Sequence, residues 1–250
     1  MSFKSKIFHF IEKFLARKTD YIVCISEAEK QSAIQNDVAG EEKLVLIKNG
    51  IDINKVRSAK SLKRSDYNIP DDAYVVGMIG RLCQQKAPDI FIRSAKLIKE
   101  KIPNSFFVIV GDGNMGDEVT DYAKANNLDL LITGWVDNPY SYLKMFDIAL
   151  LLSRWEGFGL AIVEYMAAEK NVIASRTDAI PTIIEDGVDG LLVEVDNEQD
   201  VFDKVYYIYT HPQEAMFMRE KALNKVKQYY DVNRVASQHM ELFHKLVDAK

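Results

Sequence analysis

Residues 147–165 read DIALLLSRWEGFGLAIVEY and join an apolar run to a helical pattern through a turn with two glycines. The run Ile148–Leu152 is apolar at every position, which is typical of a parallel strand covered on both faces. Gly157 and Gly159 mark the turn, and Leu160 begins the helical pattern. A strand that leads through a short turn into a helix is the repeating unit of an α/β fold.

Outward from this stretch, short apolar runs alternate with longer helical patterns. The expected strands are residues 43–48, 74–79, 106–110, 130–133, 148–152, 171–174 and 190–193. The expected helices are residues 88–100, 116–126, 139–146, 160–169, 181–185 and 198–210. This alternation predicts an α/β fold with a right-handed, doubly wound parallel sheet of the Rossmann type.

Both ends of the chain predict helical appendages. Residues 2–17 form an amphipathic helical pattern in which basic residues outnumber the single acid, Glu12. Two interpretations stay open: the helix packs on its own domain, or the segment Ser2–Lys18 docks on a partner or makes a peripheral contact with an anionic membrane. Residues 212–250 predict two further helices, separated near Asp231.

The composition is that of a soluble globular protein. Of 250 residues, 48% are hydrophobic and 28% are charged, and 32 basic against 37 acidic residues give a net charge of −5. These values exclude disordered, collagen-like and small disulfide-rich chains, and the acidic balance argues against non-specific nucleic-acid binding. No apolar run approaches the roughly 18 residues of a membrane-spanning helix. With only Cys24 and Cys83, and no recognisable secretion signal, we expect a reducing cytoplasm.

The turn after Leu152 has the features of an anion site. Gly157 and Gly159 allow the backbone to approach a ligand, and the first N–H groups of the following helix attract negative charge. Glu156 in the turn and Glu164 in the helix are eight residues apart, so each would contact a different part of one elongated ligand, such as a sugar nucleotide. The alternative is a plain tight turn in which Glu156 caps the helix.

A second group of candidate residues follows the strand at residues 74–79. Gly80 and Arg81 come directly after this strand, and Lys86 follows shortly afterwards. Arg81 supplies a planar fork and Lys86 a point charge, which together can hold a diphosphate. The alternative is a solvated basic loop.

Two other turns give weaker signals. Residues 111–113, Gly-Asp-Gly, are similar to part of a dinucleotide-binding loop, but a plain strand–helix turn is the favoured interpretation. Residues 134–136, Gly-Trp-Val, follow another strand, and their backbone could contact a nucleobase, although Trp135 fits a core position equally well. The four histidines are scattered, which predicts no metal site; they are His9, His211, His239 and His244.

Together these motifs resemble the family 4 retaining glycosyltransferases, whose B-type fold has two Rossmann domains. The resemblance covers residues 20–201, and its Glu-x7-Glu element is specific to this class. The matching segments are VCISEAEK (23–30), IKNGID (47–52), GRLCQQK (80–86), IVGDG (109–113), EGFGLAIVE (156–164) and EDGVDGLLV (185–193). Residues 178–182, Asp-Ala-Ile-Pro-Thr, depart from the glycine pair and Pro-Glu that this family usually has.

The resemblance implies a role for each candidate residue. Arg81 and Lys86 would bind the donor diphosphate and Glu156 would lie by the donor hexose, which makes these three the catalytic residues. Glu164 would hold the ribose hydroxyls. The other residues expected around the donor are Gly80, Val136, Gly157, Phe158, Gly159 and Leu160. The donor would be a UDP- or GDP-linked sugar, and neither a metal nor another cofactor is expected.

Members of the family carry an N-terminal Rossmann domain with the acceptor site, and residues 2–19 match only its end. We therefore expect the last helix of that domain at residues 1–20, a nucleotide-sugar-binding domain at 21–210, and C-terminal helices at 211–250. The implied function is the donor-binding half of a retaining hexosyltransferase for cell-envelope or capsular saccharides, at the cytoplasmic face of the membrane. A missing N-terminal domain or a partner chain would supply the saccharide or lipid-linked acceptor. The alternative is a non-catalytic nucleotide-sugar-binding or regulatory subunit that needs a partner chain for activity.

Overall fold

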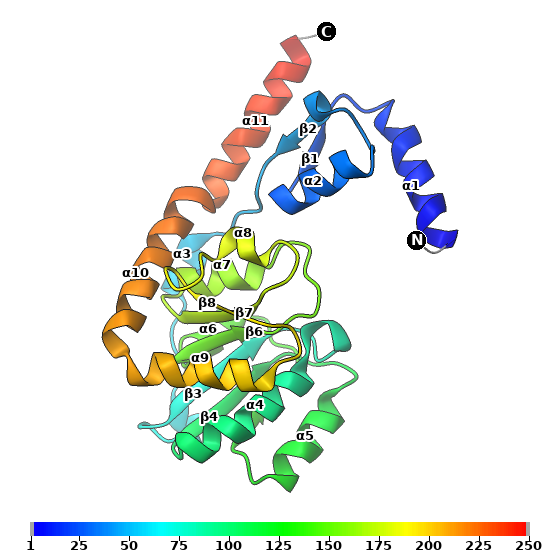
Figure 1. The fold of residues 1–250 in the computed structure, drawn as a ribbon. Coiled ribbons are helices and arrows are strands. Elements are labelled where there is room, and N and C mark those ends of the chain that lie inside the picture. Colours follow the sequence, from blue (N-terminus) through cyan, green and yellow to red (C-terminus); the bar gives the residue numbers. More distant parts are fainter. Residues whose placement is uncertain (1–2, 249–250) are drawn as a thin grey trace.

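The computed structural model describes the backbone of residues 3–248 and the side chains of residues 7–248 (Figure 1). The chain forms a large part around a six-stranded sheet and a small part around a two-stranded sheet. The helical positions predicted at Ser2, Ala249 and Lys250 lie outside the described residues. Among the described helices, none combines the length and the apolar character needed to cross a bilayer.

The large sheet is parallel throughout and has the order β5-β4-β3-β6-β7-β8. Its strands are β3 (Tyr74–Ile79), β4 (Ser105–Val110), β5 (Leu130–Ile132), β6 (Ile148–Leu151), β7 (Asn171–Ser175) and β8 (Leu191–Val193). This confirms the predicted doubly wound sheet. The strand order reverses between β3 and β6, and open α/β sheets bind ligands at such a switch point, beyond the carboxyl ends of the strands.

Helices cover both faces of this sheet, because alternate strand residues point to opposite sides. Val76 belongs to an apolar core with α4 (Pro88–Lys101), α5 (Gly116–Ala125) and α9 (Glu198–Thr210). Val75 belongs to a second core on the other face. The helices of that core are α3 (Ile53–Ser58), α6 (Pro139–Leu143), α7 (Leu160–Ala167) and α8 (Ile180–Ile183), with the later part of α10 (Pro212–Tyr229).

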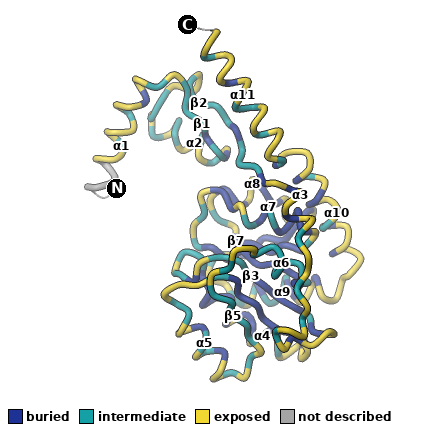
Figure 2. The backbone as a smooth tube through the Cα atoms, turned by 180° about the vertical axis from the view of Figure 1, so that it is seen from behind, coloured by how far each residue is buried: buried dark blue, intermediate teal, exposed yellow. Residues whose placement is uncertain are grey.

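The small part consists of β1 (Ile22–Cys24), α2 (Glu27–Gln35) and β2 (Leu44–Leu46), flanked by α1 (Phe3–Ala16) and α11 (Val232–Asp248) (Figures 1 and 2). The strand expected at residues 43–48 therefore exists, but it pairs with β1 and not with the large sheet. The prediction of two C-terminal helices is confirmed.

Two backbone segments connect the large part to the small part, one at Ile51 and the other at Tyr230–Val232, and they are hydrogen-bonded to each other. The Ile51 N–H donates to the Tyr230 carbonyl at 2.9 Å, and the Val232 N–H donates to the Ile51 carbonyl at 3.0 Å. Asp52 caps α3 by accepting the Lys55 N–H at 2.9 Å.

Helix α1 leaves its apolar face open, so the interpretation in which it packs on its own domain is wrong. Its attachment is polar: Lys13 pairs with Asp37 at 2.8 Å, and Lys43 donates to the Ala16 carbonyl at 3.1 Å. Figure 2 shows most of this helix exposed. The apolar face of α1 comprises Ile7, Phe8, Phe10, Ile11, Phe14 and Leu15, each between 44% and 72% exposed. The domain boundaries at residues 20 and 210 stay predictions.

Candidate functional site

The loops that follow β3 and β6 meet beyond the switch point. After β3, residues Gln84–Lys86 form a 3₁₀ turn. The Arg154 N–H in the β6–α7 loop donates to the Gln85 carbonyl at 2.8 Å, and the Gln85 side chain donates to the Trp155 carbonyl at 3.0 Å. The two candidate groups predicted from distant parts of the sequence therefore form one site.

Lys86 and Glu156 are in direct contact. The Lys86 Nζ lies 2.5 Å from the Glu156 Oε2, and the Ser153 hydroxyl donates to the same oxygen at 3.1 Å. Their side chains are only 17% and 13% exposed. The Lys86 ammonium is thus paired and largely shielded from solvent, which contradicts a freely solvated basic loop at this position.

Glu156 does not cap the helix that follows it. Gly159 is the N-cap residue of α7, and no described side chain accepts its first N–H groups. The Glu156 N–H instead donates to the Asp178 carboxylate at 2.8 Å. The first N–H groups of α7 are therefore left without a described side-chain acceptor, as an anion site requires.

Beside Arg81 lies a pocket of about 230 Å³ formed by the ends of β3, β4 and β5. Its walls are Ile79, Gly80, Arg81, Val110, Gly111, Asp112, Trp135, Val136 and Pro139. The Arg81 side chain is exposed, with one long contact to Gln85 at 3.4 Å. Trp135 is 73% exposed, so the core position considered for it is wrong, and Val136 lines the same pocket.

The turn after β4 is packed against the turn after β3. Gly111, Gly113 and Gly116 have the Gly-x-Gly-x-x-Gly spacing of a dinucleotide-binding turn. A side chain at Gly111 would collide with the Gly80 carbonyl oxygen, and one at Gly113 with the Leu82 carbonyl oxygen. These glycines therefore allow two loops to approach each other, which holds the Arg81 backbone in place.

The residues of the β6–α7 turn point in different directions. Gly159 has a φ of +97°, which favours glycine, and Leu160 is 43% exposed. A Cβ at Gly157 would have no described atom within 4 Å, so this glycine faces open space. Phe158 is buried, with its ring centroid 6.0 Å from that of Tyr230. Gly157 and Leu160 are thus available to a ligand, while Phe158 anchors the turn in the core.

Glu164 lies apart from the Lys86–Glu156 pair. Its Oε1 accepts the Tyr140 hydroxyl at 2.8 Å, and Tyr140 follows Pro139 of the pocket wall. Burial raises the pKa of Glu164, and the Tyr140 hydrogen bond acts in the opposite direction. The two glutamates therefore have separate partners, Tyr140 for Glu164 and Lys86 for Glu156.

Three charged side chains that hold the loops together were not predicted. Arg154 donates to Asp89 and to Asp196, each at 2.7 Å, and to the Gln84 carbonyl at 2.7 Å. The only sequence signal was an arginine inside the motif, because Asp89 and Asp196 lie 65 and 42 residues away.

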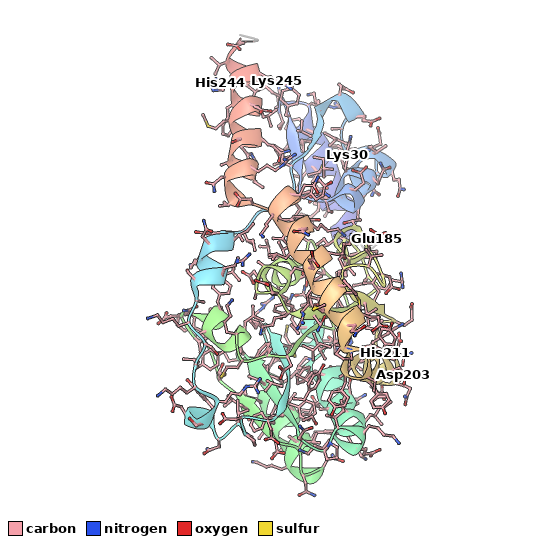
Figure 3. All side chains as sticks on the ribbon, turned by 90° about the vertical axis from the view of Figure 1, so that its left-hand side faces the viewer. Lys30, Glu185, Asp203, His211, His244 and Lys245 are labelled. Atoms are coloured by element: carbon pink, nitrogen blue, oxygen red, sulfur yellow. The ribbon has the colours of Figure 1, made fainter. Side chains whose placement is uncertain are left out.

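No group of three or more metal-binding side chains occurs among the described residues. Figure 3 shows His211 at the end of α9 and His244 towards the outer end of α11. These two histidines are far apart, in agreement with their scattered positions in the sequence.

Comparison with known proteins gives consistent matches. A family model described as "Glycosyl transferases group 1" matches residues 59–225. An Escherichia coli UDP-Gal:alpha-D-GlcNAc-diphosphoundecaprenol alpha-1,3-galactosyltransferase is 30% identical over 245 residues, which are 95% of this chain and 63% of that protein. This chain thus spans less than two thirds of that relative.

Solved structures show the same fold. Anabaena HepE in complex with UDP superposes with a TM-score of 0.84 at 22% identity, covering 92% of this chain and 65% of HepE. The C-terminal domain of LpcC, a glycosyl transferase group 1 family protein from Francisella tularensis, has a TM-score of 0.65 at 26% identity. The match covers 73% of this chain and all of the LpcC domain.

Proposed function

This chain belongs to the group 1 glycosyl transferases, and we propose that it is the donor-binding half of a retaining hexosyltransferase. The observation that carries this proposal is the contact between Lys86 and Glu156 at the switch point of the large sheet, with Arg81 on the same loop as Lys86. A nucleoside-diphosphate sugar has a diphosphate that Arg81 and Lys86 could bind, a hexose for Glu156 and a ribose for Glu164.

The diphosphate would lie between the β3 loop and the start of α7. Arg81 is exposed at the pocket and can form a bidentate contact, while Lys86 provides a localised charge. The unpaired N–H groups of α7 add partial positive charge. Charge on the leaving diphosphate grows as the glycosidic bond breaks, so these groups would stabilise the transition state more than the bound donor.

The two glutamates would bind the sugars on either side of the diphosphate. Glu156 would accept hydrogen bonds from the hexose, and Glu164 from the ribose. The nucleobase would enter the pocket beside Val136 and Trp135. In the transfer step, the bond from the anomeric carbon to the diphosphate oxygen breaks. The acceptor oxygen bonds to that carbon from the same face, and its proton passes to the departing diphosphate.

The small part provides a surface for the other half of the enzyme. Its two parallel strands have three residues each, whereas parallel sheets are normally larger and covered on both faces. The apolar face of α1 stands open beside them. We propose that a Rossmann-like domain adds strands here, covers α1 and supplies the acceptor site. By analogy with the Escherichia coli relative, the acceptor would be a lipid-linked saccharide of the cell envelope.

Titration calorimetry with UDP and with GDP tests the donor site. We expect the wild-type chain to bind one of them, and the variant with Arg81→Ala and Lys86→Ala to bind at least about tenfold more weakly, since each charge-assisted contact contributes about 1.5–3 kcal/mol. Arg17→Ala with Lys18→Ala removes two exposed charges elsewhere and serves as the control. Absence of binding by the wild type, or equal binding by the double variant, would contradict the proposal.

The open face of α1 also favours a second candidate function, a non-catalytic nucleotide-sugar-binding subunit. Donor hydrolysis by this chain alone, or transfer with an added acceptor domain that the double variant Arg81→Ala with Lys86→Ala abolishes, would support the enzyme. Transfer by a partner chain that persists when this double variant replaces the wild type would support the subunit.

A further inference from the structure

Tyr165 is a buried side chain at the candidate site that none of the proposed steps uses. It follows Glu164 on α7, and its side chain is fully buried. The Ile79 N–H at the end of β3 donates to the Tyr165 hydroxyl at 2.8 Å. The same hydroxyl lies 3.3 Å from the Ile79 carbonyl oxygen, to which it donates. One phenol group therefore satisfies both backbone groups of Ile79.

These contacts replace a missing part of the sheet ladder. β3 pairs with β4 up to Ile79 and Val110, but its described pairing with β6 is limited to Val76 with Ile148 and Gly77 with Ala149. Continued in the same register, Ile79 would face Leu151. The tyrosine hydroxyl takes the place of that strand, so the sheet is split between β3 and β6 at its carboxyl end.

We propose that Tyr165 is a positioning residue that holds β3 and β6 apart and thereby sets the width of the nucleotide-binding crevice. This inference rests on the proposed function, because the width matters only if a donor nucleotide enters between the two loops. The loops concerned follow these two strands directly, with Gly80 and Arg81 on one side and Glu156 on the other.

Removal of the hydroxyl would move the wall of the crevice. The Ile79 N–H and carbonyl would be left buried without partners, which is unfavourable. They can recover hydrogen bonds only if β6 closes onto β3 or if water enters. Ile79, Gly80 and Arg81 all line the same pocket, so either response displaces the groups proposed to hold the diphosphate.

The phenol is suited to this position because it both accepts and donates a hydrogen bond. Burial raises the pKa of Tyr165, so the group stays neutral and keeps its proton at physiological pH. Phenylalanine has the same shape without the hydroxyl, which makes Tyr165→Phe the smallest change that tests the inference.

The experiment compares UDP and GDP binding to the wild type, Tyr165→Phe and Tyr67→Phe by calorimetry. Tyr67 is the matched control, since its hydroxyl bonds that of Tyr142 at 3.0 Å, away from the crevice. We expect Tyr165→Phe to bind about tenfold more weakly and Tyr67→Phe to stay within about twofold of the wild type. Equal affinity of Tyr165→Phe and the wild type would overturn the inference.

Amide hydrogen exchange of the wild type provides a measurement that does not depend on the folding of a variant. The Ile79 amide should exchange as slowly as those of the β3–β4 ladder, although β6 does not pair with it. Exchange at the rate of an exposed amide would show that Tyr165 does not hold this strand end. Failure of the wild type to bind UDP or GDP contradicts the proposed function, and slow exchange at Ile79 would still support the contact.

Discussion

Lys86 and Glu156 form a charge-neutral pair. Because both side chains are largely buried, neither charge is well solvated, and each depends on the other. A diphosphate that binds Lys86 must therefore compete with the Glu156 carboxylate. If Glu156 contacts the donor hexose as proposed, the same carboxylate would weaken nucleotide binding and strengthen sugar binding.

Glu156→Gln should accordingly bind UDP or GDP more tightly than the wild type, by about three- to tenfold, because the competing negative charge is gone. Calorimetry at low and at high salt measures the effect, which should shrink as salt screens the charges. Glu194→Gln removes a mainly exposed carboxylate and controls for net charge. Unchanged or weaker nucleotide binding by Glu156→Gln would contradict the competition.

Lys170 is a second largely buried cation, at the amino end of β7, whereas the candidate site lies beyond the carboxyl ends of the strands. Its Nζ donates to the Lys144 and Phe146 carbonyls at 3.1 and 2.6 Å. Burial lowers the pKa of Lys170 to about 8 from its ordinary value of 10.5. Between these two pH values the unfolded chain binds more protons than the folded chain, so the contribution of Lys170 to stability rises with pH.

Lys170→Met should therefore lose more stability at pH 10 than at pH 7, by about 2 kcal/mol. Urea unfolding of the wild type and the variant at both pH values gives this difference, and the comparison cancels the ionisation of tyrosines. Lys96→Met, at an exposed position on α4, should show no such pH dependence. An equal loss at pH 7 and pH 10 would show that the Lys170 pKa is not lowered.

At the scale of elements, glycines serve two different purposes in the turns around the site. Gly111 has a φ of +142° and packs against the Gly80 carbonyl, so it is required for the fold of two neighbouring turns. A Cβ added at Gly157 would have no described atom within 4 Å, and the φ of Gly157 is not in the left-handed region. Folding therefore does not require a glycine at this position. A glycine that folding does not require, at the start of α7, is consistent with close approach of a ligand.

Gly111→Ala and Gly157→Ala should thus affect different properties: the first the stability of the fold, the second the binding of the nucleotide. We expect Gly111→Ala to lower the free energy of unfolding by about 2 kcal/mol or more, because of the collision and the positive φ. Gly157→Ala should leave the melting temperature unchanged and weaken UDP or GDP binding about tenfold. Thermal unfolding and calorimetry on both variants measure this. A Gly157→Ala variant that binds the nucleotide normally would argue against ligand contact at this turn.

The sequence predicted most elements of the large sheet because their signals are local. Continuous apolar runs mark buried strands, and the rule that ligands bind beyond carboxyl strand ends brought Arg81 and Glu156 to one edge. Helix α2 was missed because none of its described residues is buried, so no apolar stripe marks it. The strand at residues 43–48 was predicted, but a local pattern cannot tell which sheet a strand joins.

The contacts that position the site were harder to predict. Tyr165 contacts Ile79 across 86 residues, and the Asp178 carboxylate holds the Glu156 N–H across 22. Such pairs depend on how elements pack together, and no periodicity in the sequence records them. Residues that would touch the ligand were therefore easier to find than residues that hold them in place.

At the scale of the whole molecule, the two parts differ in how much apolar surface they bury. The large part has an apolar core on each face of six strands. The small part has two strands of three residues each, and neither apolar core includes them. Burial of apolar surface is the main favourable term in folding, so the small part should be much less stable by itself.

Hydrogen exchange measured by mass spectrometry should reveal this difference directly. Peptides that cover residues 22–46 should exchange by local opening, while peptides that cover β4 should exchange only when the large part unfolds. Because Ile51 is hydrogen-bonded to Tyr230 and Val232, the two connecting segments should show intermediate protection from exchange. Local opening of the small part should end at these segments. An added N-terminal Rossmann domain that pairs with β1 and covers the apolar face of α1 should slow exchange in residues 22–46 and leave β4 unchanged. Equal protection of both parts in the chain alone would mean that the small part is already complete, and it would remove the physical reason for expecting a partner on that surface.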